Sequence, residues 1–214
     1  MKKIIFISFA LVLSFIGVAQ EKINEGVLTF KQSMSSDNEQ INAQLQMMGE
    51  TTATTYFKGD KSRNESSTPM TGDMVIIMDG SKKQMLMLMD MGMGKKYTLQ
   101  STDPKEEDLK NVTVEKGTET KTVLGYKCQK YTVKMKQNGQ DAEMVLYTTD
   151  KISAISQNTT AMGDKVEGFP LYFEMKMNQM GAVINVISEV TSIEEKAVSD
   201  EKFSLTPPEG YVKM

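Results

Sequence analysis

The stretch that decides the expected fold reads Met85-Leu86-Met87-Leu88-Met89-Asp90-Met91-Gly92-Met93. Its five methionines occupy alternate positions, and successive side chains of a β-strand point to opposite faces. A strand here therefore places five thioethers on one face, with Leu86 and Leu88 on the other. Burying one methionine side chain is worth roughly 1.5–3 kcal/mol, so such a face must be covered by other groups.

Strand-like segments lie on both sides of this stretch. Asp79-Gly80 directly before it is a strong hairpin signal, and Asn138-Gly139 and Gly181 mark further turns. So many strands joined by short turns predict a mainly β fold, namely a curled antiparallel sheet or half-open barrel. The other expected strands comprise residues 24–34, 51–58, 62–67, 74–78, 95–100, 112–115, 118–124, 126–135, 142–148, 171–178 and 182–193.

Helical patterns are scarce, and we expect one to three short helices. Residues 38–48 carry Ile41, Leu45 and Met48 at helical spacing. Asp103-Pro104 resembles a capped helix start, which predicts one or two turns ending near Lys110.

The N-terminus has the pattern of a secretory signal peptide. Lys2 and Lys3 precede an apolar run over residues 4–16, and Gly17-Val18-Ala19 offers small residues for cleavage. We predict a signal peptide over residues 1–19 and a single β-rich domain over residues 20–214. We therefore expect a periplasmic or secreted protein that is not an integral membrane protein, because the apolar run is too short for an ordinary span.

Composition excludes several kinds of chemistry. The chain contains no histidine, which removes histidine general bases, serine and cysteine triads that rely on histidine, and imidazole metal sites. Cys128 is the only cysteine, so no internal disulfide can form, and we interpret it as a buried structural thiol. A formal charge of −3 with no basic cluster argues against nucleic-acid binding. We expect no enzymatic activity and no cofactor.

The methionines allow three interpretations. They can fill an adaptable core, line a cavity for a lipid or other apolar ligand, or hold a soft metal ion such as copper(I). The candidate ligand-binding residues comprise Met85, Met87, Met89, Met91, Met93, Phe30, Met175 and Met177. No metal site is expected on the first hypothesis, whereas the copper alternative would use Met89, Met91 and Met93.

Several motifs in order resemble a family of uncharacterised exported proteins, a domain of unknown function common in Bacteroidota. The motifs are Tyr56-Phe57-Lys58-Gly59-Asp60-Lys61-Ser62-Arg63, Ile76-Ile77-Met78-Asp79, Thr120-Lys121-Thr122-Val123-Leu124-Gly125-Tyr126-Lys127-Cys128, and Phe203-Ser204-Leu205 with Pro208-Glu209-Gly210-Tyr211. Such proteins resemble the periplasmic lipoprotein-carrier architecture, in which short helices close the concave face of a half-open barrel around acyl chains. The resemblance implies a barrel strand for the methionine stretch and a lid for residues 38–48, and it implies no catalytic residue.

The function expected from the sequence is therefore non-enzymatic binding of a lipid or other apolar ligand in a methionine-rich cavity. The alternatives are a copper(I)-binding protein and a structural envelope protein whose methionines only fill the core. The sequence does not identify a protein partner.

Overall fold

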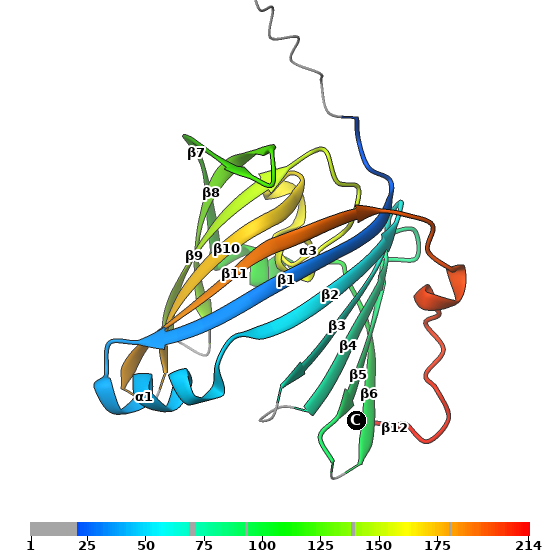
Figure 1. Ribbon diagram of the computed structural model, residues 1–214, viewed down its shortest axis with the longest axis horizontal. Coiled ribbons are helices and arrows are strands. Elements are labelled where there is room, and N and C mark those ends of the chain that lie inside the picture. The colour runs from blue at the N-terminus through cyan, green and yellow to red at the C-terminus, as the bar shows by residue number, and fades with distance from the viewer. Residues whose placement is uncertain (1–20, 69–71, 93, 138–139, 180) are drawn as a thin grey trace, which may run out of the picture.

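The computed structural model describes residues 21–68, 72–92, 94–137, 140–179 and 181–214, and these residues form one twelve-stranded sheet. Figure 1 shows the sheet curling around a concave face without closing into a barrel. This arrangement confirms the predicted mainly β fold. The predicted signal peptide, the Asn138-Gly139 turn and Met93 lie outside the described residues.

The strands agree closely with the segments expected from alternation, except that residues 112–115 and 118–124 belong to one strand. The strands are β1 (Glu25–Ser36), β2 (Thr51–Lys58), β3 (Lys61–Thr68), β4 (Gly72–Asp79), β5 (Gln84–Asp90), β6 (Lys95–Ser101), β7 (Val112–Val123), β8 (Tyr126–Gln137), β9 (Gln140–Thr149), β10 (Phe169–Gln179), β11 (Ala182–Glu195) and β12 (Val212–Lys213). The helices are α1 (Glu39–Met48), α2 (Glu106–Lys110) and α3 (Gln157–Thr160), with short 3₁₀ turns η1 (Gly163–Lys165) and η2 (Asp200–Phe203).

One long-range pairing organises the sheet. In one part of the sheet, β1 to β6 lie side by side in sequence order, and in the other part β7 to β11 do the same. The two series are joined where β1 pairs antiparallel with β11. The strand order is β12-β6-β5-β4-β3-β2-β1-β11-β10-β9-β8-β7. Residues 102–111, which include α2, connect β6 near one edge to β7 at the other.

The methionine stretch forms the second strand of the predicted hairpin. Asp79 lies opposite Gln84, so residues 80–83 make the turn between β4 and β5. The Asp79 carboxylate accepts hydrogen bonds from Ser81 Oγ at 2.6 Å and from the Lys82 N–H at 3.1 Å. These bonds fix the turn from inside, which explains why a buried aspartate occupies its first corner.

The strand β5 is shorter than the alternation predicts, because it ends at Asp90. Gly92 follows with a φ of 77°, a left-handed conformation that favours glycine. The Gly92 N–H lies 3.3 Å from Asp90 Oδ1, to which it donates. The expectation of five methionines on one strand is therefore wrong for Met91, which lies beyond the strand end.

The C-terminal segment covers the outer face of the sheet, which we define by Val27, Tyr56, Ile77, Leu86 and Leu88. Figure 1 shows this segment passing outside the strands from β11 toward β12. Its apolar side chains pack against two groups of outer-face residues: Val198 and Phe203 contact the Val27 cluster, and Leu205 and Tyr211 contact the Leu86 cluster. The leucine face of β5 is consequently buried.

Ion pairs and polar contacts also hold the C-terminal segment against the sheet. Lys58 Nζ lies 3.0 Å from Asp200 Oδ1, and Arg63 Nη1 donates to the Lys202 carbonyl at 3.3 Å. The Lys202 ammonium lies 4.1 Å from the centre of the Tyr56 ring. The tail is thus held across β2 and β3 by charge as well as by apolar packing.

The helices α1 and α3 occupy different places on the sheet. The predicted helix at residues 38–48 is α1, where Asn38 Oδ1 accepts a hydrogen bond from the Ile41 N–H. Figure 1 places α1 beside the far end of β1 and shows α3 within the curve of the sheet. Met162 and Val166, which flank η1, pack against Tyr131 and Val133. The segment over the concave face is therefore residues 155–166, whereas the resemblance implied residues 38–48.

Candidate functional site

The register of the sheet gathers methionines on one face, here called the inner face. Directly opposed residues of antiparallel strands share a face. One row of opposed residues runs Met89, Met74, Ser66, Ala53, Phe30 and Val190, and a second runs Met34, Val186, Met175, Met144 and Val133. The described inner-face methionines are Met34, Met74, Met78, Met85, Met87, Met89, Met135, Met144, Met175 and Met177.

The residues predicted to bind a ligand differ in burial. Met85 is buried at 4% exposure, and Met87 and Met89 are half-buried. Met91 is 48% exposed beyond the strand. Phe30, Met175 and Met177 are half-buried on the inner face, on β1 and β10.

A cleft of about 700 Å³ lies between the two ends of the curled sheet. Met78 and Met85 come from the β4–β5 hairpin, Met135 comes from β8, and Met162 follows α3. Met78, Met85 and Met162 are buried, and Met135 is half-buried. Exposed charged residues also border the cleft, among them Asp103, which forms an ion pair with Lys83 at 3.1 Å. The cleft therefore combines a soft apolar wall with a polar border.

A second, smaller pocket of about 250 Å³ adjoins the cleft, because both are lined by Met78 and Gln157. Its walls include Phe30 and Phe173 from the sheet and Asn158 from α3. Its floor has hydroxyl and amide groups from the centre of the sheet, which are Thr55, Ser62, Asn64, Ser66 and Ser188. Asn64 Nδ2 donates to Thr55 Oγ1 at 2.9 Å.

Only part of the predicted set lines these two spaces. Met85 lines the cleft and Phe30 lines the smaller pocket. Met87, Met89 and Met91 line neither space, and Met175 packs in the cluster of Met144 and Met162. The polar floor of the smaller pocket was not predicted, although Ser62, Asn64 and Ser66 occupy every second position of one expected strand. Which face of that strand turns inward depends on its pairing partners.

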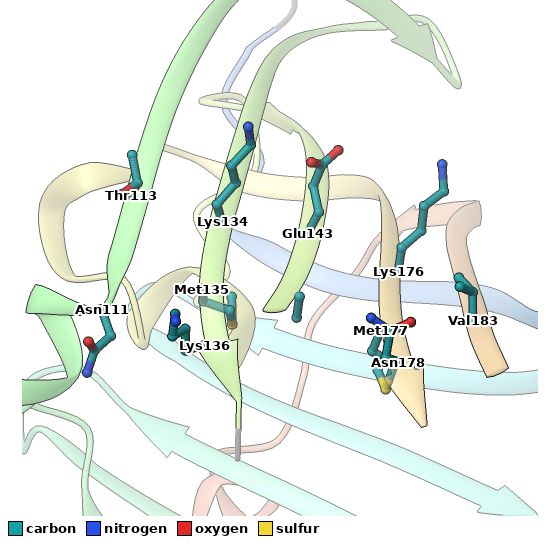
Figure 2. A pocket seen from close by; sticks show the side chains of 11 residues that line it. Asn111, Thr113, Lys134, Met135, Lys136, Glu143, Lys176, Met177, Asn178 and Val183 are labelled. Carbon is teal, nitrogen blue, oxygen red and sulfur yellow. The ribbon is translucent and has the colours of Figure 1, made fainter. Parts of the chain in front are cut away.

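A third hollow, of about 640 Å³, lies beside the end of β8, the start of β9 and the end of β10. Figure 2 shows Lys134, Glu143 and Lys176 extending to the same side. The three residues are direct cross-strand neighbours, so their charges alternate across the sheet. Lys134 precedes Met135 on β8 and therefore points away from the inner face. Met177 also borders this hollow.

The surroundings of two buried titratable groups, the Asp79 carboxyl and the Cys128 thiol, shift their pKa values. Burial would raise the pKa of Asp79, but the hydrogen bonds from Ser81 and Lys82 and the charges of Lys82 and Lys61 outweigh it, so this pKa is lowered. Burial raises the pKa of the Cys128 thiol to about 11. Cys128 is fully buried, which confirms the predicted burial of this thiol.

Within the described ranges, no three Cys, Asp or Glu side chains gather in a way that could hold a metal ion. These side chains supply thiolate and carboxylate ligands, and this absence does not extend to the thioether sulfur atoms of methionine. Over the same ranges, the helices are all too short or too polar to cross a membrane.

Comparison with known proteins gives a family but no activity. No curated protein sequence matches the chain. A solved structure titled "Structure of PNGF-II in C2 space group" is similar to 87% of this chain with a TM-score of 0.47 and 14% identity. The similar region spans 31% of that protein's chain. The model of the family described as "Domain of unknown function (DUF4412)" matches residues 25–211, so the chain belongs to the DUF4412 family.

Proposed function

We propose that this protein binds a lipid or another apolar ligand in the cleft between the ends of its sheet and catalyses no reaction. The observation that carries this proposal is the set of four methionines around the cleft: Met78, Met85, Met135 and Met162. They come from three separate parts of the chain, so the wall is built by the tertiary fold and not by the 85–93 stretch alone.

The size and chemistry of the cleft support this proposal. Small-molecule sites commonly have volumes of about 300–1,000 Å³ and are mostly apolar, and the cleft falls in that range at about 700 Å³. Methionine side chains are unbranched and polarizable, so they adapt to ligands of varied shape. A wall of this kind suits a flexible hydrocarbon chain better than a rigid polar substrate.

The proposed location is the periplasm or the extracellular space. It rests on the signal-peptide pattern of residues 1–19, with its basic start at Lys2 and Lys3 and its apolar run over 4–16. The non-enzymatic assignment is supported by the absence of histidine from the whole sequence and by the raised pKa of Cys128, which keeps that thiol protonated at neutral pH.

A cavity-filling variant tests the proposal. Ala161 is exposed and lines the cleft, so Ala161→Trp places a large ring there without replacing a buried side chain. Ala43→Trp on exposed α1 is the matched control, because Ala43 borders neither the cleft nor the smaller pocket. We expect Ala161→Trp to weaken binding of a fluorescent fatty acyl probe at least about tenfold, and Ala43→Trp to leave it unchanged.

Mass spectrometry of solvent extracts from purified wild-type protein adds an independent measurement. Lipid recovered from wild type and reduced in Ala161→Trp supports the proposal. Wild-type protein that neither retains lipid nor binds the acyl probe would refute it.

One observation favours copper(I) as a second candidate ligand. Met74 lies directly opposite Met89, and Met87 is the diagonal neighbour of Met74. Opposed Cβ atoms are about 4.5–5.5 Å apart, and diagonal positions remain within reach of long side chains. All three residues are only half-buried, so their sulfur atoms are candidates for soft-metal ligands. This set differs from the predicted Met89, Met91 and Met93, because Met91 has left the strand.

A further inference from the structure

We infer that the ligand carries an uncharged hydrogen-bonding head group, which occupies the smaller pocket beside the cleft while the apolar chain lies against the methionines. This inference rests on the proposed function and adds the chemical class of the ligand. Its basis is the contrast between two adjoining spaces that share Met78 and Gln157.

The smaller pocket offers hydrogen-bonding groups that the protein itself leaves unused. Ser62 and Ser188 are each only 4% exposed, and they lie on the inner face of β3 and β11. Among the described residues, neither hydroxyl oxygen has a hydrogen-bond partner. Over the described ranges, the fully buried side-chain oxygen or nitrogen atoms without a partner are Ser153 Oγ and Asn185 Oδ1, so neither serine oxygen is fully buried. The two hydroxyls are therefore accessible from the pocket and can still donate and accept.

Amide groups from both walls extend this surface. Gln32 and Asn64 border the pocket from the sheet, and Gln157 and Asn158 border it from α3. Asn64 uses Nδ2 for its bond to Thr55 Oγ1, which leaves its carbonyl oxygen as an acceptor. The pocket thus presents donors and acceptors from opposite sides.

The pocket offers no compensation for a charge. None of the described residues that line it is Asp, Glu, Lys or Arg. A buried charge without a partner is strongly disfavoured, whereas a buried hydroxyl or amide is tolerated when its hydrogen bonds are made. An alcohol, ester or amide head group therefore fits, and a carboxylate, phosphate or ammonium head group is selected against.

The relative sizes of the two spaces support the same division. The smaller pocket, at about 250 Å³, is below the range of most complete ligand sites. It is large enough for a compact head group, while the cleft of about 700 Å³ accommodates a chain. Three phenylalanines, Phe30, Phe169 and Phe173, border the smaller pocket and provide apolar contact next to the polar floor.

The experiment compares four probes with the same eighteen-carbon chain: 1-oleoylglycerol, oleamide, oleate and oleylamine. Their affinities are measured at pH 8 below the aggregation threshold, by displacement of a fluorescent acyl probe from the mature protein. We expect the neutral glyceride and amide to bind at least about tenfold more tightly than the charged acid and amine.

The double variant Ser62→Ala/Ser188→Ala links any preference to this pocket. It should reduce the preference for neutral head groups several-fold and leave displacement by oleate unchanged. Ser67→Ala is the matched control, since Ser67 is exposed on the outer face of the same strand as Ser62.

The outcomes separate this inference from the proposed function. Equal affinity for all four probes, tighter binding of oleate, or a preference that survives the double variant overturns the head-group assignment and leaves apolar binding intact. Failure of every probe to bind, with no lipid copurifying, overturns both.

Discussion

Met78 lies directly opposite Met85 across the β4–β5 hairpin, and both side chains are almost completely buried, at 2% and 4% exposure. The same register sets Met74 opposite Met89, where both side chains are only half-buried. The methionine face is therefore divided along its length. Its turn end belongs to the core and to the inner wall of the cleft, and its open end is accessible.

This division predicts unequal costs of truncation. Met85→Ala removes a buried side chain and should lower the free energy of unfolding by about 2–5 kcal/mol. Met91→Ala should change it by less than about 0.5 kcal/mol, because Met91 is 48% exposed beyond the strand. Urea denaturation of the two variants checks the difference, and equal costs would contradict the burial described here.

Replacement of thioethers by leucine separates the apolar role from the metal role. Met74→Leu, Met87→Leu and Met89→Leu conserve volume and apolarity, so each should cost less than about 1.5 kcal/mol. Lipid retention should persist in the triple variant, since none of the three residues lines the cleft.

Copper(I) titration against a competing chelator completes that test. If the accessible methionines bind copper, the affinity should collapse in the triple variant, because leucine has no sulfur ligand. The comparison variant carries leucine in place of Met144, Met162 and Met175, and it is called the comparison set. Copper binding that is lost only in the comparison set would exclude the hairpin site.

The Asp79 carboxylate should make stability depend on pH. Because its pKa is lowered in the folded protein, the ionised form stabilises the fold above the unfolded-state pKa of about 3.9. That contribution is lost as the pH falls through the lower folded-state pKa. Asp79→Asn should therefore cost about 1 kcal/mol at pH 7 and progressively less below pH 4.

Asp73→Asn is the control for the Asp79 prediction, since Asp73 is exposed on the same strand. Thermal or urea unfolding between pH 7 and pH 3 provides the measurement. A difference between wild type and Asp79→Asn that stays constant over this range would contradict the role of the charge.

The single thiol should be unreactive in the folded protein. Cys128 is fully buried and its pKa is about 11, so little thiolate exists at pH 8. We expect iodoacetamide to modify Cys128 only after unfolding in guanidinium, as followed by intact mass. Modification of the folded protein at the rate of a free peptide thiol would show that this site opens readily.

Local patterns in the sequence determined the elements of this fold. Alternating side chains marked the strands, Asp79-Gly80 marked the hairpin, and the spacing of Ile41 and Leu45 marked α1. These features depend on residues close together in the chain, where periodicity and turn chemistry act directly. The C-terminal end of β5 could not be predicted in this way. The strand ends at Asp90, before the turn at Gly92, whereas the alternation of methionines continues beyond it.

The tertiary structure decided which surfaces meet. Pairing of β1 with β11 joins the two hairpin series and turns Ser62 and Ser188 toward the same pocket. Packing of residues 155–166 on the inner face brings Met162 to the cleft, and the C-terminal segment buries Leu86 from the other side. These contacts join residues far apart in sequence. The alternation of a strand specifies two faces, but only its partners determine which one is inside.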